Sequence, residues 1–105
     1  MEIITVQVDE DLSDLIPGYL KKQFDDTVKM RGALAAGDYE TIRVIGHGMK
    51  GTGAGYGFNE ISSLGSKIEQ AAEGKTEKSI SSYISMLLDY LSRINVVYVP
   101  EVEDY

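Results

Sequence analysis

The stretch GHGMKGTGAGYGF, residues 46–58, decides between two folds for this chain. Its first six residues fit the letters G-x-G-x-x-G, and residues 41–45 resemble the strand that precedes such a loop in dinucleotide-binding proteins. The stretch also continues a helical pattern. If the stretch is a helix, it carries His47 on a surface where most of the neighbouring residues are glycines without side chains.

The nucleotide interpretation fails on the sequence that follows. A dinucleotide fingerprint requires a second parallel strand after the helix, with an acidic residue at its end. Here the residues after the glycines have the periodicity of two helices, and Glu69 lies inside one of them. Lys50 is followed by Gly51 rather than by a hydroxyl residue, which argues against a G-x-x-x-x-G-K-[ST] phosphate loop. We therefore interpret the stretch as a helix followed by a tight turn.

Apolar residues recur at helical spacing in four segments with recognisable ends. Pro17 suits the start of the first, Gly37 and Asp38 separate the first from the second, and Gly55 and Gly57 suit the turn after the second. The third and fourth are expected to begin at Asn59 and Thr76, with Gly74 ending the third. The residues at helical spacing are Leu20, Phe24, Val28 (or Thr27), Arg31 and Ala35; Ile42, Ile45, Met49, Thr52 and Tyr56; Ile61, Leu64, Gly65, Ile68 and Ala72; and Ile80, Tyr83, Ile84, Leu87, Leu91 and Ile94.

Short connections make sequential helices antiparallel neighbours, so the pattern predicts an all-α, up-down-up-down four-helix bundle. We expect a single domain over residues 1–105, with the core bundle at about 17–95. A short extra helix is predicted over residues 9–16, capped by Asp9. Both termini would leave the bundle at one end, where residues 3–8 and 96–99 can pair as a small ribbon. Residues 101–105 are expected to form an acidic tail.

Composition narrows the range of functions. The net charge of −7 and the pI of about 4.5 argue against nucleic acid and anionic membranes as partners. The chain has no cysteine and one histidine, which excludes disulfides, thiolate metal sites and His-rich zinc sites. It lacks a membrane-spanning apolar run and a basic secretory leader. We expect a cytoplasmic monomer without a metal or cofactor of its own.

The polar residues of the glycine-rich helix fall on one stripe. Arg43, His47, Lys50 and Gly51 are spaced so that they share a surface away from the apolar line. His47 and Glu69 are equally distant in sequence from Phe58, so an antiparallel hairpin brings them face to face. A carboxylate that accepts from Nδ1–H fixes the tautomer, leaves a lone pair on Nε2 and makes the ring more nucleophilic. Lys50 places positive charge where a phosphoryl group would lie.

The glycines of this helix require an explanation. Each costs about 0.8–1 kcal/mol relative to alanine in a helix interior. Close packing can account for one or two of them, and on the outer face their absent side chains would let the backbone of another protein approach. The residues expected to form this docking surface are Arg43, Gly48, Gly51 and Ala54 on one helix and Ser62, Gly65 and Ser66 on the next. The second group can alternatively ease packing between the two helices.

These residues resemble a known family. His47-Gly48-Met49-Lys50-Gly51, the turn at 55–58 and the IEQAA run at 68–72 are similar to the histidine phosphotransfer (HPt) domain. The core pattern of that family is H-x-x-K-G, followed by a glycine-containing turn and a leucine-rich helix. The resemblance is strongest over the second and third helices, includes the entry to the first, and is generic over the last.

The resemblance implies that His47 is phosphorylated, with Lys50 and Gly51 as its supporting pair. The family has a polar residue at the position of Glu69, glutamate in chemotaxis kinases and frequently glutamine in phosphorelays, which leaves the donor open. Phosphate would come from a receiver-domain aspartyl phosphate or a histidine kinase. It would leave to the aspartate of a response-regulator receiver domain, whose site carries Mg²⁺. The chain would thus be a phosphoryl carrier without its own ATP site rather than an enzyme. The alternative is a degenerate or structural helical bundle that docks signalling proteins without phosphotransfer.

Overall fold

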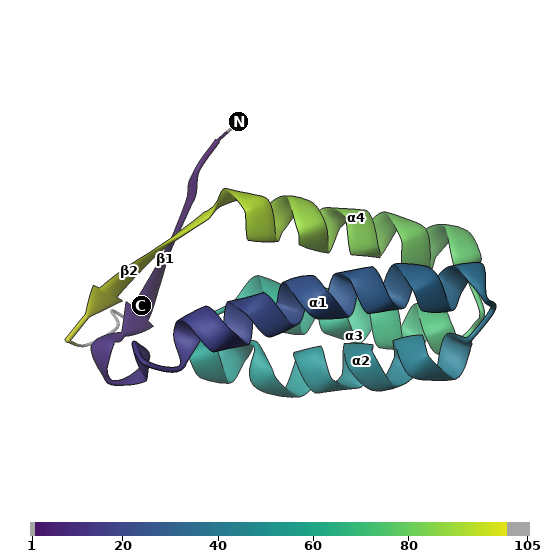
Figure 1. The fold of residues 1–105 in the computed structure, drawn as a ribbon, viewed down its shortest axis with the longest axis horizontal. Coiled ribbons are helices and arrows are strands. Elements are labelled where there is room, and N and C mark those ends of the chain that lie inside the picture. Colours follow the sequence, from purple (N-terminus) through teal and green to yellow (C-terminus); the bar gives the residue numbers. More distant parts are fainter. Residues whose placement is uncertain (1, 101–105) are drawn as a thin grey trace.

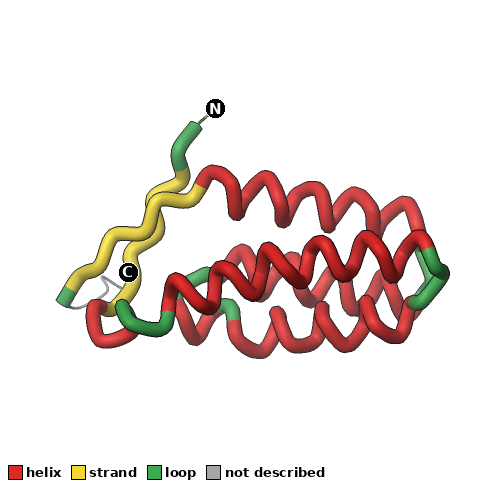
Figure 2. Tube along the Cα trace, in the orientation of Figure 1, coloured by secondary structure: helices red, strands yellow, loops and turns green. Residues whose placement is uncertain are grey.

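The computed structural model describes residues 2–100, so the predicted tail at 101–105 lies outside the described residues. Within that range the chain forms four α-helices and a two-stranded sheet (Figure 1; Figure 2). The elements in order are β1 (Ile4–Asp9), the 3₁₀ turn η1 (Glu10–Leu12), α1 (Ile16–Ala35), α2 (Tyr39–Thr52), the 3₁₀ turn η2 (Ala54–Tyr56), α3 (Asn59–Glu73), α4 (Glu77–Arg93) and β2 (Ile94–Val99).

The helices lie side by side around a common apolar core. α1 packs against α2 and α4, and α3 packs against the same two helices (Figure 1). The helix periodicity of α2, α3 and α4 predicted most of the side chains that face inward. The fully buried ones include Ile42, Ile61, Ile68, Ile80, Ile84 and Leu87.

The closest contact is between α2 and α3, and three glycines make it possible. A Cβ on Gly46 would lie 2.9 Å from both the Glu69 nitrogen and the Gly65 oxygen. A Cβ on Gly65 would lie 2.6 Å from the Lys50 nitrogen, and one on Gly53 would lie 2.5 Å from the Ser62 nitrogen. These distances are too short for any side chain, so the two backbones touch where the glycines lie.

The prediction for α1 was wrong about which face is buried. Its core face carries Tyr19, Gln23, Thr27 and Met30, together with Ile16 and Ala33. Of the expected line, Phe24, Val28, Arg31 and Ala35 are exposed and Leu20 is half-buried, whereas Thr27, the alternative to Val28, is buried. Hydropathy misled the assignment because two polar residues, Gln23 and Thr27, occupy the buried stripe.

Several predicted helix ends are confirmed. Pro17 lies in the first turn of α1. Gly37 has a φ of 70°, a left-handed conformation that glycine adopts without strain, and it ends α1. The backbone N–H of Thr41 then donates to Asp38 Oδ1 over 3.1 Å, which caps α2.

Other boundaries differ from the prediction. The N-cap position of α3 is Phe58, and Asn59 is already helical. α2 ends at Thr52 and the chain continues through η2 to Gly57, whose φ of 96° makes the turn into α3. The short helix expected over residues 9–16 is only the turn η1, although Asp9 does cap it by accepting from the Asp11 N–H over 2.9 Å.

The predicted pairing of the two ends is confirmed, and the strands run parallel. The register sets Ile4 beside Ile94 and Asp9 beside Val99. The parallel direction follows from the path of the chain, because residues 10–15 turn it back before α1 begins (Figure 1). β1 also rests on the α2–α3 turn, where the Gln7 oxygen would lie 3.3 Å from a Cβ on Gly57 and Val8 is fully buried. Within residues 2–100, no helix is both long and apolar enough to cross a bilayer.

Candidate functional site

His47 projects from the outer face of α2 towards Glu69 on α3. Its Nδ1 lies 2.7 Å from Glu69 Oε2, and the proximity predicted from sequence is confirmed. The His47 side chain is 69% exposed while that of Glu69 is only 11% exposed. The carboxylate is therefore fixed within the protein and the ring extends from it into solvent.

The close packing of α2 on α3 at Gly46 explains how Glu69 comes to lie beside His47. Gly46 immediately precedes His47, and its missing Cβ lets α2 reach the backbone nitrogen of Glu69. The short side chain of Glu69 then spans the remaining gap to the ring. The close helix pairing thus determines the distance between the imidazole and the carboxylate.

The surroundings of Glu69 keep its carboxylate ionised. The hydrogen bond with His47 is the largest influence and lowers the pKa of Glu69 below 4.5. Burial acts in the opposite direction, and the positive charge of Lys50 adds to the lowering. Lys50 Nζ lies 3.6 Å from Glu69 Oε1, so each carboxylate oxygen has its own partner.

Access to the other ring nitrogen is open. A Cβ placed on Gly48 or on Gly51 would meet no atom within 4 Å outside its own helix backbone. The four glycines between residues 46 and 53 therefore divide equally: Gly46 and Gly53 allow packing against α3, while Gly48 and Gly51 leave open surface. An imidazole that is held at Nδ1 and otherwise largely exposed can act as a nucleophile through Nε2.

The remaining predicted site residues have varied positions. Arg43 forms two hydrogen bonds with Glu40, of 2.9 and 2.6 Å, so its guanidinium is paired within α2. Ser62 accepts from the Ala54 N–H and donates to the Lys50 oxygen, which joins the end of α2 to α3. Gly65 is buried against α2 and serves packing. Ser66 is half-buried and Ala54 is exposed.

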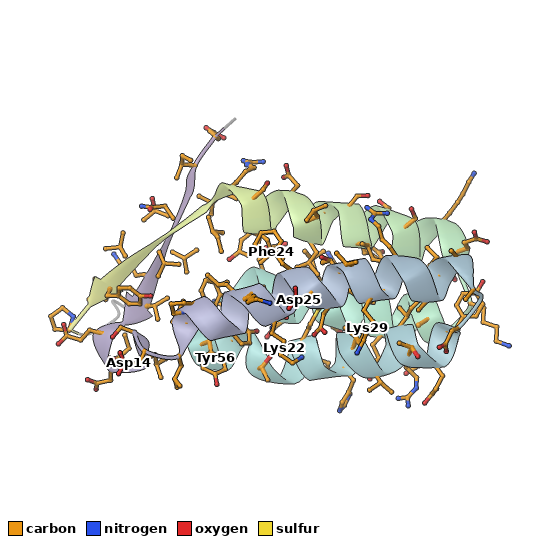
Figure 3. The ribbon with its side chains drawn as sticks, viewed as in Figure 1. Asp14, Lys22, Phe24, Asp25, Lys29 and Tyr56 are labelled. Carbon is orange, nitrogen blue, oxygen red and sulfur yellow. The ribbon has the colours of Figure 1, made fainter. Side chains whose placement is uncertain are left out.

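The sequence analysis did not predict a set of contacts that α1 makes with the other side of α2. The hydroxyls of Tyr19 and Thr52 are 3.0 Å apart, and Thr52 Oγ1 donates to the Gly48 oxygen over 3.0 Å. Tyr19 also stacks on Tyr56, with ring centroids 4.4 Å apart. α1 thereby steadies the turn of α2 that carries Gly48. The labelled Tyr56 and Lys22 lie along the α2 side of α1 (Figure 3). The sequence analysis did not identify Tyr19 as a contact residue because it lies outside the apolar line expected for α1.

The described residues contain no cluster of three or more His, Asp or Glu side chains arranged to hold a metal ion. Comparison of the chain with models of known protein families, with curated proteins and with solved structures found no match.

Proposed function

We propose that this chain is a histidine-containing phosphocarrier of a multistep phosphorelay, built as an up-down-up-down four-helix HPt bundle. His47 accepts a phosphoryl group on Nε2 from a receiver-domain aspartate or a histidine kinase. It passes the group to a receiver-domain aspartate, and the required Mg²⁺ is held by the receiver. The chain needs no nucleotide site for this reaction.

One observation carries the proposal: an exposed imidazole is joined at Nδ1 to a largely buried, ionised carboxylate at 2.7 Å. A surface histidine without a function does not need such a partner. Glu69 is held where it can orient the ring and select the tautomer that leaves Nε2 free. Gly48 and Gly51 leave the approach to that nitrogen unobstructed.

The chemistry balances with these groups. Nε2 attacks the phosphorus of an aspartyl phosphate, a P–N bond forms, the P–O bond to the aspartate breaks, and that carboxylate leaves with the electron pair. The ring keeps its proton on Nδ1 and becomes positively charged, and Glu69 stabilises this charge across the 2.7 Å contact. Lys50 offsets negative charge on the moving phosphoryl group.

The test is intact-mass measurement after mixing the protein with a phosphorylated receiver domain. The proposal expects a gain of one phosphoryl group that is lost in acid, as a phosphoramidate is, and no gain in His47→Gln. A His47→Gln protein that still accepts phosphate would refute the assignment. An unchanged mass with every donor, combined with tight receiver binding, would instead favour the docking bundle that does not carry phosphate.

A further inference from the structure

The outer face of α1 is more apolar than a solvated surface requires. Val28 is 74% exposed and Phe24 is 39% exposed, and they lie one turn apart on the same face. Leu88 of α4 is 40% exposed beside them. We call the surface formed by Phe24, Val28, Gly32 and Leu88 the α1 stripe. In Figure 3, Phe24 lies between α1 and α4, and Asp25 lies on the front of α1.

The two faces of α1 are mixed in polarity rather than sorted as in an ordinary amphipathic helix. The core face includes Gln23 and Thr27, whereas the outer face carries Phe24 and Val28. A helix normally turns its apolar stripe towards the core and its polar residues towards water. Contiguous apolar surface left exposed is a common feature of interaction sites.

Gly32 adds an observation that the fold of one chain does not explain. It lies in the interior of α1, where glycine is a much poorer helix former than alanine. A Cβ at this position would meet nothing within 4 Å outside its own helix backbone. Gly32 is one turn beyond Val28, so its missing side chain flattens the stripe where a second helix could approach closely.

The charges beside the stripe indicate which molecule covers it. Asp25 and Arg31 lie on either side of Val28, three positions before and three positions after it. Arg31 donates to Ser85 Oγ over 2.8 Å and forms no ion pair with any of residues 2–100. Among the same described residues, Asp25 pairs with Lys21 alone, in an exposed contact that contributes little. Both side chains are exposed, and neither contact is strong enough to prevent it from pairing with an opposite charge on another molecule.

We propose that a second copy of this chain covers the stripe, with the two α1 helices antiparallel and a twofold axis at Val28. A twofold contact is self-complementary, so each residue before Val28 is level with one after it in the second copy. Asp25 is then level with Arg31 of the second copy, and Phe24 is level with Gly32 of the second copy. The ring of Phe24 fits where glycine leaves room, and Val28 packs on its own symmetry mate.

The surface is also hollowed where the second copy would sit. A depression of about 180 Å³ is lined by Phe24, Asp25, Thr27, Val28, Arg31 and Leu88. The site containing His47 lies on α2 and α3, so pairing through α1 leaves the imidazole accessible. This assigns a dimer where the sequence alone predicts a monomer, and it does not depend on the proposed phosphotransfer.

The experiment measures molecular mass by sedimentation equilibrium, with protein concentrations up to roughly 1 mM. We expect the wild-type chain to dimerise and Val28→Glu to raise the dissociation constant by about 30-fold or more. Val44→Glu is the matched control, because Val44 is an exposed valine on α2, and it should dimerise like the wild type. Thermal melting should show that both variants remain folded.

Charge reversal tests the register. Asp25→Arg and Arg31→Asp should each weaken the dimer, because each places like charges level with one another. The double variant should recover most of the affinity, since it exchanges the two charges. A wild-type chain that stays monomeric at every concentration overturns the proposal, and this is also the result expected if a different protein covers the stripe. A dimer that survives Val28→Glu, or a double variant no better than the single ones, equally overturns it.

Discussion

Gln23 shows how a single residue conflicts with its surroundings. It is 2% exposed, its amide donates to the Tyr19 oxygen over 3.2 Å, and its Oε1 is buried without a hydrogen-bond partner in the described chain. An unsatisfied buried acceptor costs more than the single hydrogen bond returns. We therefore expect Gln23→Met to raise the free energy of unfolding by about 1 kcal/mol.

Chemical denaturation measures this change. Gln23→Glu is the matched control, because it places a charge in the same buried position and should lower stability. If Gln23→Met is less stable than the wild type, Oε1 has a partner such as a buried water molecule.

Glu69 provides a prediction on pH at the same scale. Its pKa is lowered in the folded protein, chiefly by the hydrogen bond with His47. The ionised carboxylate therefore contributes stability fully above pH 4.5, and this contribution is lost as the pH falls through the lower folded pKa. We expect the stability difference between the wild type and Glu69→Gln to shrink as the medium is acidified from pH 5. Urea titrations at a series of pH values test this, and a difference that grows on acidification would contradict it.

Loss of Glu69 should also change the tautomer of the His47 ring. In Glu69→Ala the Nδ1–H of His47 has no acceptor, so the population of the tautomer with a free Nε2 should fall and phosphotransfer should slow without stopping. Nitrogen chemical shifts of the imidazole report the tautomer, and rapid-quench kinetics report the transfer. An unchanged tautomer and rate would mean that the contact has no effect in solution.

At the scale of the helix, replacing two different glycines of α2 by alanine should change the stability of the protein in opposite directions. Gly46→Ala places a Cβ 2.9 Å from backbone atoms of α3, which must move apart, at a cost of about 1–3 kcal/mol. Gly48→Ala enters open space and should stabilise the helix by up to about 1 kcal/mol. Thermal melts of the two variants separate these outcomes. If both behave alike, α2 is rotated from the position described above.

A substitution at Gly51 should affect receiver binding without lowering the stability of the protein. Gly51→Gln replaces a helical glycine in open space, so the protein should be at least as stable as the wild type. The long side chain would nevertheless fill the approach to His47, and we expect weak receiver binding and poor phosphotransfer. Lys50→Ala should keep more of the binding while the transfer rate falls. A Gly51→Gln protein that transfers normally would place receiver docking elsewhere.

Sequence periodicity was informative for α2, α3 and α4 and misleading for α1. The meeting of His47 and Glu69 was predictable because they are equally spaced about the turn at Phe58. The buried face of α1 was not predictable, because it carries Gln23 and Thr27 while Phe24 and Val28 remain outside. Local hydropathy describes how apolar a face is, but not whether the core or another molecule covers it.

For the whole molecule, the parallel ribbon makes the two ends of the chain depend on each other. A two-stranded sheet is marginal by itself, and parallel pairing requires a long crossover, here the entire helical region. The direction of pairing depends on how residues 10–15 turn the chain, which no hydropathy pattern specifies. The ribbon is anchored by Val8, which is fully buried, and by the contact of β1 with Gly57.

Removal of residues 2–8 should therefore destabilise the whole protein. Burial of one valine contributes about 1.5–3 kcal/mol, so the melting temperature should fall by roughly 5–15 °C. Val8→Ala should reproduce part of this loss without deleting the strand, while Thr5→Ala, at an exposed position of β1, should change little. The His47–Glu69 contact joins α2 and α3 only, so phosphotransfer by the shortened protein should persist at temperatures where it remains folded. A melting temperature unaffected by the deletion would mean that the strands pair without stabilising the helices, and that the core does not require Val8.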